Sequence, residues 1–152
     1  MEFNDVVEKY SNMVFRLAYS MTKNKSDSED IYQDVFMRYL RSDTHFESEK
    51  HRKAWLIRVT INRSKSFLTS AWFRNTTAFD IEMATPENEI DGVYWAVMEL
   101  PRKYRTVIHL YYYEDMPIDE IAKTTGDKPP TIASQLHRAR AMLKEKLNGE
   151  EF

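Results

Sequence analysis

The 152-residue sequence has no cysteine, only three glycines and five prolines, and no apolar run near the roughly 20 residues that span a membrane. Without cysteine, disulfides, thiolate zinc sites and cysteine nucleophiles are excluded, which fits a reducing compartment. So little glycine and proline argues against a turn-rich β-sandwich or barrel. Alanine, leucine, methionine and long charged residues are plentiful and favour helices, so we expect an all-α protein.

The sequence also lacks an excess of basic charge, since 22 Lys and Arg face 24 Asp and Glu and the formal net charge is -2. Basic side chains that neutralise phosphates supply most non-specific DNA affinity. A chain this neutral is expected to bind DNA weakly unless a partner holds it there. Residues 1–5 are acidic and lack the basic-then-apolar order of a secretory signal, so we expect a cytoplasmic location.

Residue patterns for catalysis or metal binding are sparse. The histidines His45, His51, His109 and His137 show no spacing typical of metal ligands. No glycine-rich phosphate loop and no nucleophile elbow is present. The consecutive tyrosines 111–113 are interpreted as half-buried aromatics of a helix. The sequence therefore predicts neither an enzyme nor a cofactor.

Apolar residues at three- and four-residue steps predict three helices in the first half of the chain. The first helix carries such a series from Val7 to Met21. The second begins at the acidic cluster of residues 27–30, whose side chains suit free amides and the helix dipole, and runs to about Arg41. After a polar loop of residues 42–50, the third helix runs from about Arg52 to Ala71.

At about 100° per residue, the second helix has two distinct sides. The core side carries Ile31, Tyr32, Val35, Phe36, Tyr39 and Leu40. The outward side carries Asp30, Gln33, Asp34, Met37, Arg38 and Arg41. Charged helix faces are usually only solvated, but a methionine among mixed charges also suits a protein interface.

One face of the third helix combines an aromatic, an amide and two cations. Trp55, Arg58, Asn62 and Lys65 fall within an arc of about 80°. Aromatic rings stack on unpaired bases, cations hold the backbone and an asparagine can read a base edge. This face suits single-stranded or distorted DNA; a core tryptophan beside solvated charges remains the alternative.

The apolar period fades after residue 75, so we expect a flexible acidic linker over 76–92 between a first domain, 1–75, and a second, 93–149. In the second domain, helices are predicted over about 92–99, 102–113, 118–125 and 130–147. Gly126 suits a left-handed turn, and Pro129 and Pro130 suit the first turn of the last helix. The last pair of helices is typical of a helix-turn-helix.

The last helix also has two sides at helical geometry. Its core side carries Ile132, Leu136, Ala139 and Leu143. Its opposite side carries Thr131, Ser134, His137, Arg138 and Ala141, and is only modestly basic. Entry into a DNA major groove and an ordinary helical hairpin are both compatible with this pattern.

Three sets of segments, in order along the chain, resemble the extracytoplasmic-function sigma factors of bacterial RNA polymerase. The first is Ser28–Phe36, similar to the polymerase-binding helix of region 2. The second is Ala54–Val59 with Asn62, similar to the promoter-melting and recognition helix of that region. The third is Leu100–Arg105, Met116–Ala122 and Leu136–Arg140, similar to region 4.

The resemblance implies a fold of two small helical domains, a region 2 bundle and a region 4 helix-turn-helix, and a role for each predicted face. Residues implied to bind polymerase are Asp30, Gln33, Asp34, Met37 and Arg38. Residues implied to read and melt the downstream promoter element are Phe46, Glu47, Ser48, Lys50, Trp55, Arg58, Asn62 and Lys65; Phe46 and its loop resemble an element that captures a flipped base. Residues implied to meet the upstream element are Thr131, Ser134, Gln135, His137 and Arg138.

The implied partners are RNA polymerase core, promoter DNA and an anti-sigma factor, with no membrane insertion and no small-molecule substrate. The DNA would be duplex upstream and non-template single strand downstream. Ala133 and Gln135 stand where the family often has basic residues, and Pro129 and Pro130 replace a small polar pair. Contacts with the upstream element are therefore expected to be fewer than is usual in the family, or to prefer a different DNA sequence. The alternatives are a stand-alone helix-turn-helix regulator and a helical adaptor that binds proteins only.

Overall fold

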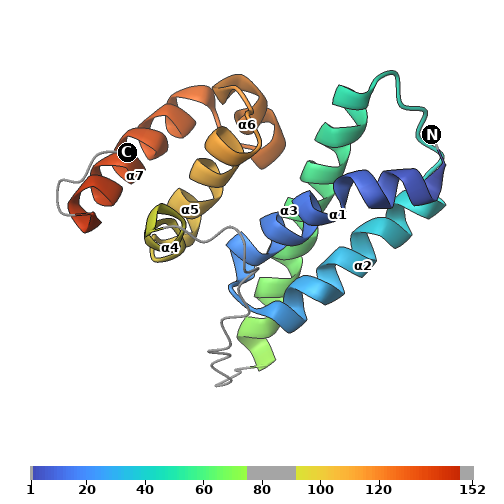
Figure 1. Cartoon of the computed structure of the whole chain (residues 1–152), viewed down its shortest axis with the longest axis horizontal. Helices are drawn as coiled ribbons and strands as arrows, with labels where there is room; N and C mark the ends of the chain where they lie inside the picture. Colours follow the sequence, from blue (N-terminus) through green and yellow to red (C-terminus); the bar gives the residue numbers. More distant parts are fainter. Residues whose placement is uncertain (1, 75–91, 148–152) are drawn as a thin grey trace. The chain divides into compact units, whose positions relative to one another are not determined.

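The computed structural model describes residues 2–74 and 92–147. Every regular element in these two ranges is a helix, and neither range contains a strand, so the all-α prediction is confirmed. The chain divides into two units, Met1–Met83 and Ala84–Phe152 (Figure 1). Apart from Gly92, the predicted linker of residues 76–92 lies outside the described residues.

The first unit consists of α1 (Phe3–Thr22), α2 (Lys25–Arg41) and α3 (Glu49–Arg74), and each of these helices packs against the other two (Figure 1). Fully buried side chains from all three form the core, among them Val6, Val14, Leu17, Ile31, Val35, Leu56, Ile57 and Ile61. The apolar seam of α1 starts at Val6, whereas Val7, the start expected from the sequence, is only half-buried.

Both α2 and α3 begin earlier than the sequence suggested, because polar side chains cap them. The Asn24 side chain accepts a hydrogen bond from the Asp27 amide at 2.8 Å, so α2 begins at Lys25 and the acidic cluster lies inside the helix. The Ser48 hydroxyl accepts from the His51 amide at 3.1 Å, just ahead of α3.

The core side expected for α2 extends one residue too far. Ile31, Val35 and Phe36 are buried, as the helical period predicts. Leu40 is 54% exposed, so its placement in the core was wrong. It lies in the last turn of α2, next to the point where the helix ends and the polar loop begins.

The second unit comprises α4 (Gly92–Met98), α5 (Arg102–Ile108), the π-helical turn η1 (His109–Tyr113), α6 (Ile118–Thr125) and α7 (Pro129–Lys146). The single helix expected over 102–113 is therefore an α-helix that widens in its last five residues. The Glu114 amide donates to the His109 carbonyl at 3.2 Å, five residues back, which is the π pattern.

The helix-turn-helix has the turn chemistry that its sequence indicates. Gly126 adopts φ of 86° and its amide donates to the Ala122 carbonyl at 2.9 Å, closing α6. Pro129 and Pro130 occupy the first turn of α7, where missing amide donors cost little. The predicted inner face of α7 is buried throughout: Ile132, Leu136, Ala139 and Leu143.

Candidate functional sites in the two units

The outward side of α2 is accessible along most of its length. Asp30, Gln33, Met37 and Arg38 are exposed, and Met37 has 42% of its surface open to solvent. Asp34 is half-buried because α3 lies beside it. An exposed methionine among charged residues can adapt its side chain to a partner surface and bury its apolar area there on binding.

A cleft between α2 and α3, with a volume of about 520 Å³, brings together residues that the sequence assigned to two separate faces. Asp34 and Arg38 come from the predicted polymerase face, and Trp55 and Asn62 come from the predicted promoter face. The full lining of this α2–α3 cleft is Asp34, Arg38, Arg41, Ser42, Trp55, Val59, Asn62 and Arg63. Residues from the two predicted faces therefore line the same cleft.

Asp34 forms ion pairs with two arginines that also line the α2–α3 cleft, and the pair with Arg63 was not predicted from the sequence. One carboxylate oxygen of Asp34 accepts from Arg63 Nε at 2.6 Å and from Arg38 Nε at 3.2 Å. Arg63 follows Asn62 directly, so it lies about 100° around α3, outside the arc that defined the promoter face. A helical wheel of α3 alone cannot predict that Arg63 pairs with Asp34, because the pair depends on where α2 lies beside α3.

The predicted base-capturing residue Phe46 lies in an aromatic cluster. Its ring stacks on Tyr39 at 5.5 Å between centroids and meets Trp55 edge-on at 5.7 Å and His51 at 5.2 Å. The Arg52 guanidinium lies 5.2 Å from the same ring, and its Nε donates to the Tyr39 hydroxyl at 3.0 Å. The loop is thus anchored at Phe46 by the ends of α2 and α3.

Neighbouring residues of the loop have structural roles as well as the predicted contact with DNA. Ser48 caps α3, and the Glu47 amide donates to Nδ1 of His51 at 3.2 Å. Lys50 is exposed in the first turn of α3. These bonds shape the loop so that it presents Phe46 against the cluster.

Glu49 ties the start of α3 to α1. Its carboxylate accepts from the Tyr10 hydroxyl at 2.7 Å, pairs with Lys9 at 3.4 Å and bonds Arg52. The hydrogen bond from Tyr10 is the main cause that lowers the pKa of Glu49. Burial, reinforced by the same bond, raises the pKa of Tyr10. This connection holds the loop-bearing end of α3 in place.

The promoter face expected on α3 is present as one accessible strip. Arg58, Asn62 and Lys65 are exposed, while Trp55 is half-buried between the aromatic cluster and the α2–α3 cleft. Part of the Trp55 ring therefore packs internally and part lines an accessible cleft, and its contact with DNA stays a prediction.

The outer face of α7 is open, as a groove-reading helix requires. Thr131, Ser134, His137 and Arg138 are exposed, and Gln135 is half-buried at the edge of that face. Arg140 does not share it: its Nε donates to the Tyr112 hydroxyl at 2.6 Å, and its guanidinium lies 5.5 and 5.6 Å from the rings of Tyr111 and Tyr112.

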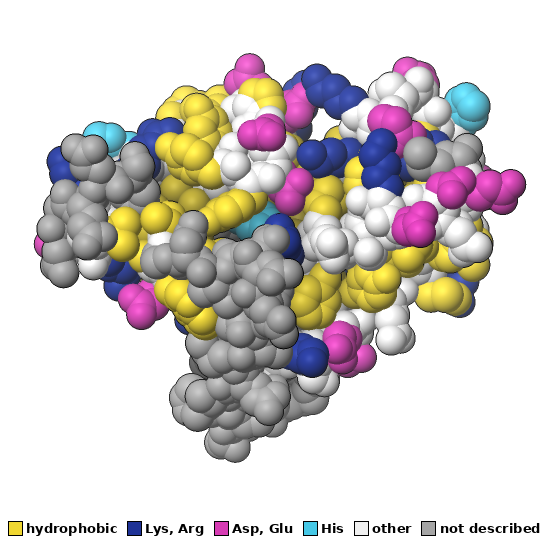
Figure 2. All heavy atoms as spheres, in the orientation of Figure 1, with side chains coloured by type: hydrophobic (Ala, Val, Ile, Leu, Met, Phe, Trp, Pro, Cys, Tyr) yellow, Lys and Arg dark blue, Asp and Glu magenta, His cyan; other side chains and the backbone are white. Residues whose placement is uncertain are grey.

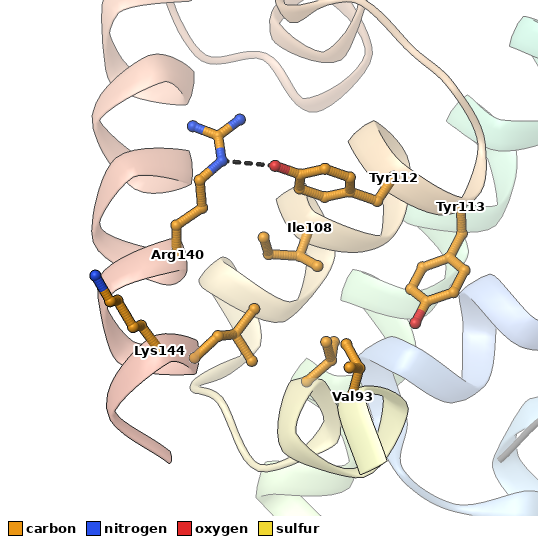
Figure 3. Close-up of a pocket in the computed structure, with 8 residues that line it drawn as sticks. Val93, Ile108, Tyr112, Tyr113, Arg140 and Lys144 are labelled. Carbon is orange, nitrogen blue, oxygen red and sulfur yellow. Dashed lines mark hydrogen bonds between the residues drawn. The ribbon is translucent and has the colours of Figure 1, made fainter. Parts of the chain in front are cut away.

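A second hollow, of about 540 Å³, lies in the second unit among α4, α5, η1 and α7. Its lining residues are Val93, Val97, Ile108, Tyr112, Tyr113, Arg140, Leu143 and Lys144. Figure 3 shows Arg140 of α7 bonded to Tyr112, with Ile108 between Arg140 and Tyr113, while the amine of Lys144 points away from the tyrosines. Tyr112 is 50% and Tyr113 41% exposed, so the expectation of half-buried tyrosines understated how open η1 is.

Charge is mixed on the face of the molecule seen in Figure 2, where basic and acidic side chains alternate over the described residues. No group of three or more His, Asp or Glu side chains suited to a metal ion occurs in the described part of the chain. No helix in this described part is both long enough and apolar enough to cross a bilayer.

Comparison with known proteins matches both units to one family. The model of Sigma-70 region 2 matches residues 6–74, and the model of Sigma-70, region 4 matches residues 93–143. The ECF RNA polymerase sigma factor SigM of Bacillus subtilis is 30% identical over 160 aligned positions, which cover 97% of this chain and 96% of SigM. SigV of the same organism is 28% identical over 143 positions, which cover 91% of this chain and 86% of SigV.

Solved structures show the same fold. The sigma factor RpoE of Bartonella quintana, in complex with the anti-sigma factor NepR, matches with a TM-score of 0.82 at 20% identity, over 98% of both chains. CnrH, in complex with the cytosolic domain of CnrY, matches with a TM-score of 0.67 at 21% identity, over 98% of this chain and 89% of CnrH.

Proposed function

This chain belongs to the sigma-70 family, in its extracytoplasmic-function class, and we propose that its two units divide the recognition of a promoter between them. It is a transcription initiation factor that binds RNA polymerase core and directs it to promoters. The observation that carries this conclusion is the match of regions 2 and 4, in that order, over most of the chain. The factor acts where the polymerase is, in the cytoplasm, and the chemistry of RNA synthesis belongs to the polymerase.

Residues 1–75 bind core polymerase and open the downstream promoter element. The exposed side of α2, with Asp30, Gln33, Asp34, Met37 and Arg38, provides the polymerase contact. The loop from Phe46 through Lys50, with Trp55, Arg58, Asn62 and Lys65 of α3, receives the non-template strand. Stacking on aromatic rings repays part of the cost of unstacking a base, which is why Phe46 and Trp55 suit this role.

Residues 93–149 hold the upstream element as duplex DNA, and residues 76–92 connect the two parts. The exposed side chains of α7, namely Thr131, Ser134, Gln135, His137 and Arg138, enter the major groove. Once both parts are bound to polymerase, each DNA contact raises the effective concentration of the other. This explains how a chain of net charge -2 can select a promoter.

An anti-sigma factor regulates this chain by covering the same surfaces. The support is that RpoE of Bartonella quintana shares this fold and was solved in complex with the anti-sigma factor NepR. The exposed Met37 on α2 offers an adaptable apolar contact to a protein that covers this surface.

Run-off transcription with purified core polymerase on a pooled promoter library tests the proposal. Factor-dependent starts are expected, Asp34→Arg should abolish them by reversing a charge on the polymerase contact, and Asn62→Ala should relax preference at one position, by about 1–3 kcal/mol. The matched controls are Glu8→Arg and Asn4→Ala, which alter exposed residues of α1. If core neither binds nor starts transcription, the stand-alone regulator or the protein-only adaptor is the better explanation.

A further inference from the structure

The α2–α3 cleft carries more positive charge than the molecule as a whole. Arg38, Arg41 and Arg63 line it together with a single carboxylate, Asp34, whereas the whole chain has a net charge of -2. Guanidinium groups bind phosphate oxygens in bidentate fashion and attract anions over several ångströms. The cleft is therefore a local cationic site on a nearly neutral protein.

The ion pair between Asp34 and Arg63 joins two helices and can exchange partners. Arg63 Nε lies 2.6 Å from the Asp34 carboxylate, but the two side chains are 34% and 39% exposed. Pairs this exposed contribute little to stability, because water and salt compete with them. Either partner can therefore leave the other for a ligand of matching charge without unfolding the unit.

The other walls of the cleft suit a nucleotide. Trp55 offers part of an indole face, and Asn62, the residue directly before Arg63, offers an amide. A volume of about 520 Å³ lies within the range of small-ligand sites and is open to solvent through exposed residues. A cation, an aromatic ring and an amide together match the phosphate, the base face and the base edge of one nucleotide.

We propose that Arg63 binds a backbone phosphate of single-stranded promoter DNA in the α2–α3 cleft, and that Asp34 restrains Arg63 in the free protein. This rests on the proposed function, in which polymerase engages Asp34 on α2. When a cationic group of polymerase takes the Asp34 carboxylate, Arg63 becomes available to DNA. Binding of polymerase thereby strengthens DNA binding through two side chains on adjacent helices.

The first test uses the free full-length chain at low ionic strength and a fluorescent single-stranded oligonucleotide of about ten nucleotides. Asp34→Asn releases Arg63, and with it Arg38, and is expected to raise affinity about three-fold, which is the scale of an exposed ion pair. Adding Arg63→Gln should abolish this gain. Asp30→Asn is the matched control, because it removes the same charge from the same helix outside the cleft.

An equal gain from Asp30→Asn would overturn the proposal in favour of general electrostatics. A gain from Asp34→Asn that persists with Arg63→Gln would overturn it in favour of Arg38, the other partner of Asp34. The absence of any gain would also overturn the proposal. A double-mutant cycle in which Asp34 and Arg63 couple while Asp30 and Arg63 do not supports it.

The second test decides the matter if the free chain binds too weakly. Holoenzyme is titrated onto forked promoter DNA over a range of salt, and Arg63→Gln is expected to reduce the slope of log affinity against log salt by about 0.7, the value for one single-strand phosphate. Lys25→Gln, at the other end of α2, should leave the slope unchanged. An unchanged slope for Arg63→Gln, with normal factor-dependent transcription by the wild type, overturns this inference and leaves the proposed function standing.

Discussion

At the scale of single residues, Glu49 illustrates how one carboxylate can position the loop that carries Phe46. It lies at the first residue of α3, directly after the segment that carries Phe46, and bonds Tyr10 of α1 at 2.7 Å. Arg52, which lies over the Phe46 ring, bonds the same carboxylate. Displacing Glu49 would therefore disturb the arginine that supports the ring of Phe46, the residue that we propose captures a base.

The Tyr10–Glu49 bond makes the stability of the first unit depend on pH in two directions. The pKa of Glu49 is lowered from 4.5, so this stabilisation is present above pH 4.5 and is lost as pH falls through the lowered value. The pKa of Tyr10 is raised from 10.0, so the stabilisation is present below pH 10.0 and is lost as pH rises towards the raised value.

Tyr10→Phe is expected to lower the free energy of unfolding at neutral pH by about 1 kcal/mol, because the bond to the carboxylate is lost. It should also flatten the fall in stability at both ends of the pH range. Scanning calorimetry of the full chain from acid to alkaline pH measures this, with Tyr32→Phe, a half-buried tyrosine of α2, as the control. Identical pH profiles for Tyr10→Phe and the wild type would contradict the assignment.

At the scale of elements, the two helices of the helix-turn-helix depend on one backbone conformation between them. Gly126 has φ of 86°, in the left-handed region, and the position its Cβ would take has no atom within 4 Å. Any cost of a side chain there comes from the backbone and not from a clash.

Gly126→Ala is expected to destabilise the second unit by about 1 kcal/mol, and Gly126→Asn by less, since asparagine tolerates the left-handed conformation. Chemical denaturation of the full chain, followed by tryptophan fluorescence and circular dichroism, gives both values. Lys123→Ala, at an exposed position of α6, is the control and should be near neutral. Equal costs for Ala and Asn would mean that the turn does not require this conformation.

At the scale of the whole molecule, the 22 basic and 24 acidic side chains nearly balance, which is expected to keep the affinity of the free chain for DNA low. Acidic and basic groups are interspersed over the described residues on the face seen in Figure 2, so this face presents no broad basic patch to a phosphate backbone. We therefore expect selectivity for promoters to depend on the assembly with polymerase, in which local cationic sites are brought to DNA together.

The free chain is expected to bind promoter DNA only in the micromolar range or more weakly near physiological salt. Core polymerase should tighten binding by about 100-fold or more, because both units then act on one DNA. Fluorescence anisotropy with a labelled promoter measures both states, and Asp34→Arg should remove most of the gain. Tight binding by the free chain would instead favour a stand-alone regulator.

Much of the fold followed from local patterns. The period of apolar residues predicted the buried face of α7 and most of that of α2, because a helix places every third or fourth side chain on one side. The predicted helix starts were less accurate. Asn24 and Ser48 cap α2 and α3 ahead of the expected residues, because several polar residues near each start are able to act as the cap. The π turn at His109 leaves no periodic signal.

The sequence by itself determined the helical class, the glycine turn of the helix-turn-helix, the chemical character of the α2 and α3 faces and the likeness to sigma factors, because these depend on residues close together in the chain. Only the tertiary structure decided that Asp34 meets Arg63 at 2.6 Å, that Phe46 packs beside Arg52 and Trp55, and that Leu40 is exposed. Each of these features depends on how one helix packs against another or on where a helix ends. The helical period alone carries no information about neighbours that are distant in sequence.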